Sequence, residues 1–187
     1  MGNLFTRNRL YGLALAALIF VADQAVKHLV VKVLGLRNIG DHYPLLPFFD
    51  FTRTNNYGVS LGMFEATSME MRWGLVVFTT LIALVVLVWL MRERRLWDIL
   101  GLGMILGGAL GNIRDRYLFG YVIDYADLHI GDFRPFLIFN VADAAITIGV
   151  VIILARALFI GEKPANEHSE AGSDVNAPAG AETKPDA

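Results

Sequence analysis

Four long apolar stretches alternate with polar connections along the chain. Residues 73–91 form the clearest of them, because they contain no charged side chain. At about 1.5 Å per residue, an α-helix of this length crosses a hydrocarbon core of about 30 Å. Residues 10–33, about 97–110 and about 136–160 are three further candidates. The pattern predicts a membrane all-α bundle of four transmembrane helices.

The first apolar stretch has a second interpretation as a cleaved signal peptide. Arg7 and Arg9 precede it, as basic residues precede the apolar core of such peptides. However, no small-x-small cleavage pattern follows, and apolar residues resume after Lys27. These features favour an uncleaved transmembrane anchor.

The connections differ in character. Residues 40–64 contain turn-forming residues between short aromatic and β-branched stretches, which predicts a small β element on the outer membrane surface. Residues 161–187 are polar and lack aromatic residues, so we expect a disordered cytoplasmic tail that the chemistry does not need. The predicted organisation is therefore a transmembrane domain over residues 1–160 and a tail over residues 161–187.

Composition supports a membrane protein and narrows its chemistry. The mean hydropathy is +0.50, and charged residues make up 18% of the chain, against about 25% in soluble domains. The net charge is −2, and the basic residues form no patch that would suggest nucleic-acid binding. No nucleic-acid partner is therefore expected. The absence of cysteine excludes disulfides, thiolate nucleophiles and cysteine zinc sites.

Clustered arginines indicate an orientation. Arg92, Arg94 and Arg95 fill the short connection between the second and third stretches, and Arg7 and Arg9 precede the first. Basic residues near membrane spans favour the cytoplasm. We therefore expect both termini in the cytoplasm, with the connections at about residues 34–72 and 117–135 on the outer side.

Polar residues gather toward the outer ends of the predicted spans. Intramembrane ionisable residues usually face the bundle interior and serve a function. Several are three or four residues apart and so share a helix face, while Gly103, Gly107 and Gly111 allow close helix packing. The layer consists of Asp23, Lys27, Asn112, Asp115, Arg116, Asp124, Asn140 and Asp143.

Two carboxylates in a poorly hydrated site supply an acid and a base together, which suits amide hydrolysis through an activated water. Spacing alone does not choose the pair among Asp23, Asp115, Asp124, Asp127, Asp132 and Asp143. Simpler interpretations exist for three groups. Asp23 and Lys27 are expected to form an ion pair, Asp115 and Arg116 a helix-end charge network, and Asp127, His129 and Asp132 a solvated loop rather than a metal site. Ser60 lacks the setting of a nucleophile elbow.

Five segments, taken in order, resemble the motifs of the bacterial lipoprotein signal peptidases, also called signal peptidase II. They are FVADQAVK from Phe20, NYGVSLGMF from Asn56, GGALGNIRDR from Gly107, YVIDY from Tyr121 and FNVADAAI from Phe139. The clearest departure is Val59-Ser60-Leu61, where the family more often has Ala-Ala-Phe. This departure leaves Asn55 as a rival to Asn56.

The resemblance implies a membrane aspartic endopeptidase of the bacterial inner membrane that cuts prolipoproteins before the diacylglyceryl-modified lipobox cysteine. It implies Asp124 and Asp143 as the catalytic pair and no metal or organic cofactor. Asn56, Asn112, Arg116 and Asn140 would line the substrate site, and Asp23, Lys27 and Asp115 would support it. We expect a monomer surrounded by membrane lipids. A small ion-coupled transporter is the alternative, and a tetraspan scaffold is a third interpretation.

Overall fold

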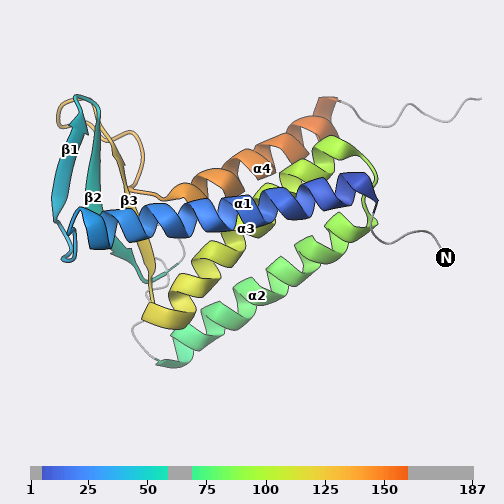
Figure 1. Ribbon diagram of the computed structural model, residues 1–187, viewed down its shortest axis with the longest axis horizontal. Helices are drawn as coiled ribbons and strands as arrows, with labels where there is room; N and C mark the ends of the chain where they lie inside the picture. Colours follow the sequence, from blue (N-terminus) through green and yellow to red (C-terminus); the bar gives the residue numbers. More distant parts are fainter. Residues whose placement is uncertain (1–5, 59–68, 160–187) are drawn as a thin grey trace, which may run out of the picture.

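The computed structural model describes residues 6–58 and 69–159. Four α-helices form the body of the molecule: α1 (Arg7–His28), α2 (Met69–Arg92), α3 (Leu96–Phe119) and α4 (Val141–Phe159). A π-helical turn, η1 (Leu29–Val33), continues α1. Helix α3 lies at the centre and packs against each of the other three helices (Figure 1).

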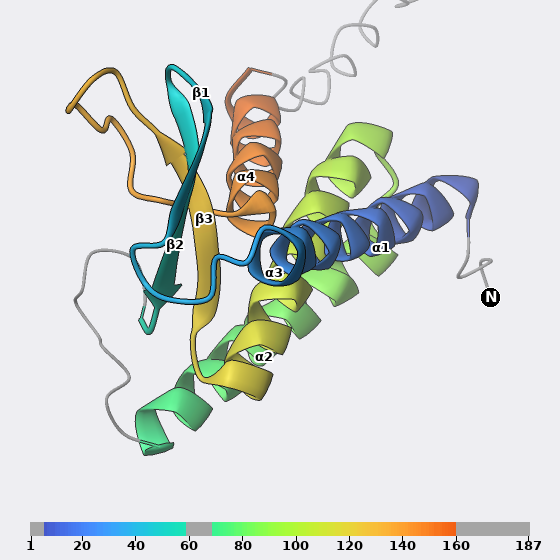
Figure 2. The same ribbon diagram turned by 60° about the vertical axis from the view of Figure 1, so that its left-hand side comes forward.

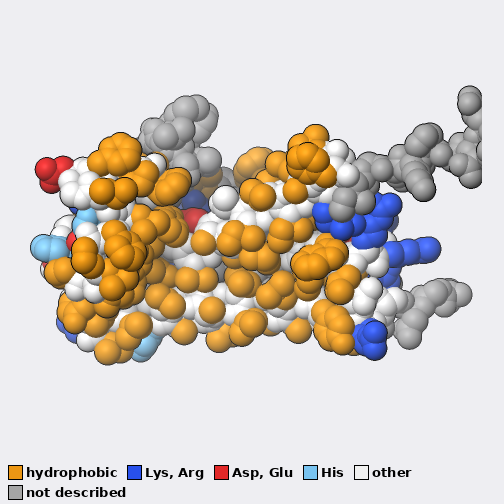
Figure 3. Space-filling view, turned by 90° about the horizontal axis from the view of Figure 1, so that it is seen from above, with side chains coloured by type: hydrophobic (Ala, Val, Ile, Leu, Met, Phe, Trp, Pro, Cys, Tyr) orange, Lys and Arg blue, Asp and Glu red, His pale blue; other side chains and the backbone are white. Residues whose placement is uncertain are grey.

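All four helices are long and apolar enough to cross a membrane, which confirms the predicted bundle. Large hydrophobic side chains cover the flank of the bundle in Figure 3, as expected of a surface that meets lipid. Two boundaries differ from the prediction. Helix α3 continues to Phe119, and α4 begins at Val141 rather than near residue 136. Asn140 therefore precedes α4 instead of lying in its first turn.

The glycines of α3 let the helices approach closely, as their spacing predicts. A methyl group added at Gly103 would lie 2.5 Å from the carbonyl oxygen of Gly12 in α1, and one at Gly111 would lie 2.6 Å from the Asp23 carboxylate. Gly108 faces the backbone of Ala142 in α4 in the same way. These glycines thus allow α1 and α4 to pack closely against α3, and Gly111 does so next to a residue of the polar layer.

A three-stranded antiparallel sheet lies at one end of the bundle, with the order β1 (His42–Leu46), β2 (Phe49–Asn56) and β3 (Val122–Leu128). Figure 2 shows it beside the end of α1 and the start of α4. The hairpin of β1 and β2 confirms the predicted β element. The prediction missed β3, which comes from the connection between α3 and α4 and pairs Thr54 with Asp124.

The two ends of the bundle differ. At the end opposite the sheet, Arg9 donates to the Glu93 carbonyl (3.2 Å) and Arg156 pairs with Asp98 (2.7 Å), so the start of α1, the α2–α3 turn and the end of α4 lie together. Lysines and arginines gather there in Figure 3. We call this the arginine end and the other the sheet end. Ser60 and the predicted tail lie outside the described residues.

Candidate active site

Asp124 lies on β3 with only 2% of its surface exposed. One of its carboxylate oxygens, Oδ1, accepts a hydrogen bond from the Asn140 amide at 2.6 Å, and the Asn56 side chain bonds to the same carboxyl group. Burial, followed by the nearby charge of Asp143, raises the pKa of Asp124 to about 7, although both amides favour the ionised form. Asp124 is thus placed to exchange a proton near neutral pH.

Asp143 lies in the first turn of α4 and is half-buried. Its Oδ1 accepts a hydrogen bond from the Asn112 amide at 2.8 Å, and its backbone N–H donates to Asn140 Oδ1 at 2.9 Å. Asn140 therefore acts as the N-cap of α4, a position that asparagine favours because its side chain satisfies an N–H group that has no partner within the helix. This cap fixes the position of the Asp143 backbone, from which its side chain extends.

The start of α4 is held by three separate parts of the fold. The Val141 N–H donates to the Tyr125 hydroxyl (3.3 Å), and the Ala142 N–H donates to Asp23 Oδ1 (3.1 Å). Together with Asn140, these groups satisfy the first three N–H groups of the helix. A carboxylate at a helix N-terminus is also favoured by the helix dipole. Asp143 is consequently positioned from α1, β3 and α4 at once.

The two aspartates are joined through two asparagines. Asn140 Nδ2, which donates to Asp124, lies 3.3 Å from Asn112 Oδ1, and Asn112 Nδ2 donates to Asp143. We call this chain of hydrogen bonds the amide bridge. It brings together four residues that the sequence assigns to one site.

A buried ion cluster supports the amide bridge. Lys27 Nζ lies 2.8 Å from both Asp23 Oδ2 and Asp115 Oδ2, and 3.4 Å from Asn112 Oδ1. Asp115 also accepts the Ile123 N–H at the start of β3 (3.2 Å). The expected Asp23–Lys27 ion pair is confirmed. Asp115 turns toward α1 and pairs with Lys27, while its interaction with Arg116 is electrostatic.

Arg116 lies beside the same pair of aspartates. Its Nη2 donates to the Gly58 carbonyl at 3.0 Å, and its guanidinium interacts electrostatically with Asp143 and Asp124. Its buried Nε has no hydrogen-bond partner among the described residues. A guanidinium presents several donors in a planar fork, so Arg116 retains donors that can hold a carbonyl.

Asn56 contacts the carboxyl group of Asp124. Its Oδ1 accepts the Gly58 N–H at 3.2 Å while its side chain bonds to Asp124. Asn55 instead lies near the Tyr57 hydroxyl (3.4 Å). The contact with Asp124 favours Asn56 over Asn55 for the expected role.

Of the three loop residues predicted to be solvated, Asp132 is exposed, whereas Asp127 and His129 have partners in the fold. Asp127 is buried, because the Arg134 guanidinium (3.0 and 3.2 Å) and the Thr52 hydroxyl (3.0 Å) bind its carboxylate. His129 faces Asp50 at 3.3 Å. Within residues 6–58 and 69–159, no group of three His, Asp or Glu side chains is arranged to hold a metal ion.

Two further residues that hold this site were given no role from the sequence. Tyr125 was not singled out, although it anchors the first N–H group of α4. Gln24 donates to Asp23 Oδ2 (3.0 Å) and Asp115 Oδ1 (3.2 Å). The aromatic residue next to Asp124 and the polar residue inside an apolar helix were the available signals.

Fold and site together define a multi-pass membrane protein. At one end of its bundle, two carboxyl groups are connected by hydrogen bonds through two asparagine side chains. Residues 15–159 match the family described as signal peptidase (SPase) II, so the chain belongs to that family. It is a peptidase family, and the transporter alternative finds no support in it.

Relatives agree with this assignment. The lipoprotein signal peptidase of Sphingopyxis alaskensis is 52% identical over 153 residues, covering 82% of this chain and 88% of that protein. The lipoprotein signal peptidase of Rhizorhabdus wittichii is 46% identical, covering 87% of this chain and 94% of its own length. A bacterial membrane enzyme solved by the in meso method at 2.3 Å resolution superposes with a TM-score of 0.70 at 25% identity, covering 84% of this chain and 94% of that one.

Proposed function

We propose that Asp124 and Asp143 are the catalytic dyad of an aspartic endopeptidase that removes signal peptides from prolipoproteins. The amide bridge is the observation that carries this proposal, because it holds two carboxyl groups of different elements around one site. The family assignment supplies the reaction class. The relatives' name, lipoprotein signal peptidase, supplies the substrate class.

The two carboxyl groups have different surroundings, which suits different roles as general acid and general base. Asp124, with a pKa of about 7, is protonated in a large fraction of molecules at neutral pH. The protonated carboxyl group of Asp124 would donate a hydrogen bond to the substrate carbonyl. Asp143 would act as the general base that takes a proton from the attacking water.

Arg116, Asn56, Asn112 and Asn140 would line the substrate site. The guanidinium of Arg116 would hold a carbonyl of the extended substrate segment. The two asparagines of the amide bridge would orient the dyad, and Asp23, Lys27 and Asp115 would keep that bridge in place. No metal or organic cofactor enters these steps.

The sheet end is proposed to face the outer side of the bacterial inner membrane, with both termini in the cytoplasm. The basic cluster at the arginine end favours this orientation. A prolipoprotein anchored by its apolar signal helix and acyl chains would then present its scissile bond, just before the lipidated cysteine, at the depth of the dyad. We expect the protein to act as a monomer among membrane lipids.

The function is tested with the full chain in nanodiscs and a diacylglyceryl-modified prolipoprotein. Mass spectrometry of the products should show one cut immediately before the modified cysteine, while the unmodified precursor should remain intact. Absence of cleavage, or cleavage at another bond, would overturn the proposed reaction.

A further inference from the structure

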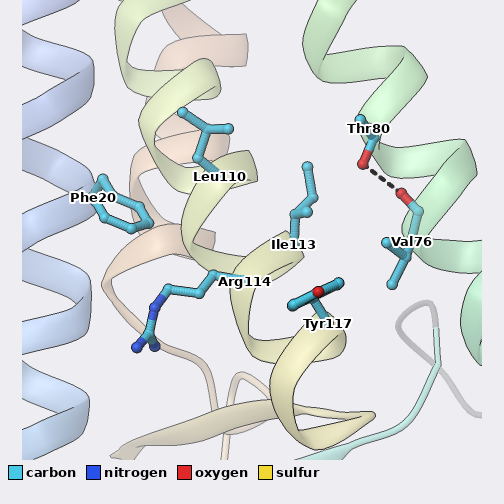
Figure 4. Close-up of a pocket in the computed structure, with 7 residues that line it drawn as sticks. All are labelled: Phe20, Val76, Thr80, Leu110, Ile113, Arg114 and Tyr117. Atoms are coloured by element: carbon cyan, nitrogen blue, oxygen red, sulfur yellow. Dashed lines mark hydrogen bonds between the residues drawn. The ribbon is translucent and has the colours of Figure 1, made fainter.

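A lipid-facing groove of about 480 Å³ lies between α1, α2 and α3 (Figure 4). Helix α3 lines it with residues spaced three and four apart, among them Leu110, Ile113 and Tyr117, which therefore share one face. Asn112 and Asp115, which contact the dyad and the ion cluster, lie on the other side of this helix. The groove is thus separate from the candidate active site.

The inner part of the groove is apolar. Phe20 and Leu110 lie on one side in Figure 4 and Val76 on the other. Thr80 is the polar side chain there, but its hydroxyl donates to the Val76 carbonyl at 2.6 Å. A molecule bound in this inner part would therefore make hydrophobic contacts only, which suits an acyl chain. Its volume is within the range of about 300–1,000 Å³ that is usual for ligand sites.

The rim toward the sheet end is cationic. Arg114 lies one helical turn beyond Leu110, and Gln24 one turn beyond Phe20. Arg114 is exposed and donates to Gln24 Oε1. Among the described residues, the carboxylate ion pairs use other basic side chains, namely Lys27, His129, Arg134 and Arg156. The Arg114 guanidinium thus keeps most of its donors and its full charge for an anion.

We propose that this groove binds one anionic phospholipid. An acyl chain lies along Phe20 and Leu110, and the phosphate accepts paired hydrogen bonds from Arg114, whose planar fork matches phosphate geometry. The diacylglyceryl group of a substrate carries no charge, so it would gain nothing from Arg114.

Gln24 fixes the guanidinium at this place. Its Nε2 is tied to Asp23 and Asp115, which leaves Oε1 directed at Arg114. Arg114 at the rim of the groove is therefore connected through Gln24 to the buried ion cluster.

Native mass spectrometry of the full chain in detergent tests the proposal, with phosphatidylglycerol, phosphatidylcholine and diacylglycerol titrated separately. Phosphatidylglycerol should bind most tightly. Arg114→Gln should weaken that binding about tenfold, the effect of losing charged hydrogen bonds, and leave the binding of diacylglycerol, which has no phosphate, unchanged. Leu110→Trp should weaken binding by filling the groove.

Two variants serve as matched controls. Arg94→Gln removes an exposed arginine at the arginine end, and Val85→Trp adds bulk on an exposed position of α2. Both should bind phosphatidylglycerol like the unaltered protein. Equal affinity for the three lipids, or an equal loss in Arg114→Gln and Arg94→Gln, would overturn the proposal. Arg114 is exposed, so its variant decides the outcome even if Leu110→Trp does not fold.

Discussion

The side-chain amides of Asn112 and Asn140 hydrogen-bond to each other at 3.3 Å, and each donates to a different aspartate. The two asparagines come from α3 and from the residue that caps α4, so the spacing of the aspartates depends on how these two helices pack. Because Gly108 lets α4 approach α3 closely, the helix packing and the site geometry share one cause.

Asn140 has two separable roles, as N-cap of α4 and as donor to Asp124. Serine also caps helices but is too short to replace the amide donor. Asn140→Ser should therefore be more stable than Asn140→Ala by about 1 kcal/mol, the contribution of the cap that it retains, yet process substrate at least tenfold more slowly than the unaltered protein. Asn140→Ala should lose both. Thermal unfolding and cleavage rates separate the two roles, and full activity in the serine variant would show that capping alone matters.

Tyr125 is expected to matter through its hydroxyl. Tyr125→Phe keeps the buried ring and its edge-to-face contact with Phe51, but leaves the Val141 N–H without its partner. The loss should lower stability by about 1–3 kcal/mol and slow cleavage by displacing Asp143. Tyr121→Phe is the matched control, since its ring contacts with Tyr57 and Phe119 remain. Equal behaviour of the two variants would contradict this role.

The raised pKa of Asp124 predicts two pH effects. The pKa moves from 3.8 to about 7, so between these values the folded state binds more protons than the unfolded state. Stability therefore falls as pH rises through this interval. Asp124→Asn should remove this loss, so its stability advantage over the unaltered protein should be larger at pH 8 than at pH 4. Thermal unfolding across pH measures the difference, and a constant difference would refute a raised pKa.

Activity should follow the same ionisation. If protonated Asp124 donates to the substrate carbonyl, kcat/KM should decline as pH rises through about 7. Infrared spectroscopy of the carboxyl band in Asp143→Asn should show Asp124 losing its proton at lower pH, because a neighbouring negative charge has been removed. An unchanged titration would mean that the two carboxyl groups do not interact.

Lys27 neutralises a pair of buried carboxylates, so its loss should be costly. Lys27→Met leaves Asp23 and Asp115 without their shared cation, which should lower stability by about 3–5 kcal/mol. Lys32→Met removes an exposed lysine a little further along and should have little effect. Similar unfolding temperatures for both variants would show that the ion cluster is not a structural support.

The sequence predicted the four helices because apolar runs of membrane length have few alternatives. It placed the end of α3 too early, since Asn112, Asp115 and Arg116 lower the hydropathy although these side chains turn inward. It placed the start of α4 too early, because the residues before Asn140 are apolar although they are not part of the helix. Among them, Phe139 pairs with Ala126 instead of entering the helix.

The strand β3 was beyond reach of local patterns. It forms because β2, far away in sequence, offers a partner, and such pairing leaves no periodic signal around Asp124. The burial of Asp127 was missed for the same reason, because Thr52 and Arg134 reach it only in the folded sheet. Motif resemblance, by contrast, placed the polar residues of the amide bridge in one site without knowledge of the strand.

The most direct test of the dyad compares cleavage of a diacylglyceryl-modified prolipoprotein by the unaltered protein, Asp124→Asn and Asp143→Asn, with a chelator present. Asp132→Asn, which alters an exposed aspartate of the same region, is the matched control. We predict that the unaltered protein and the control cut before the modified cysteine, and that both dyad variants fold but do not cut. Normal cleavage by either dyad variant would contradict the assignment of Asp124 and Asp143 as the catalytic pair.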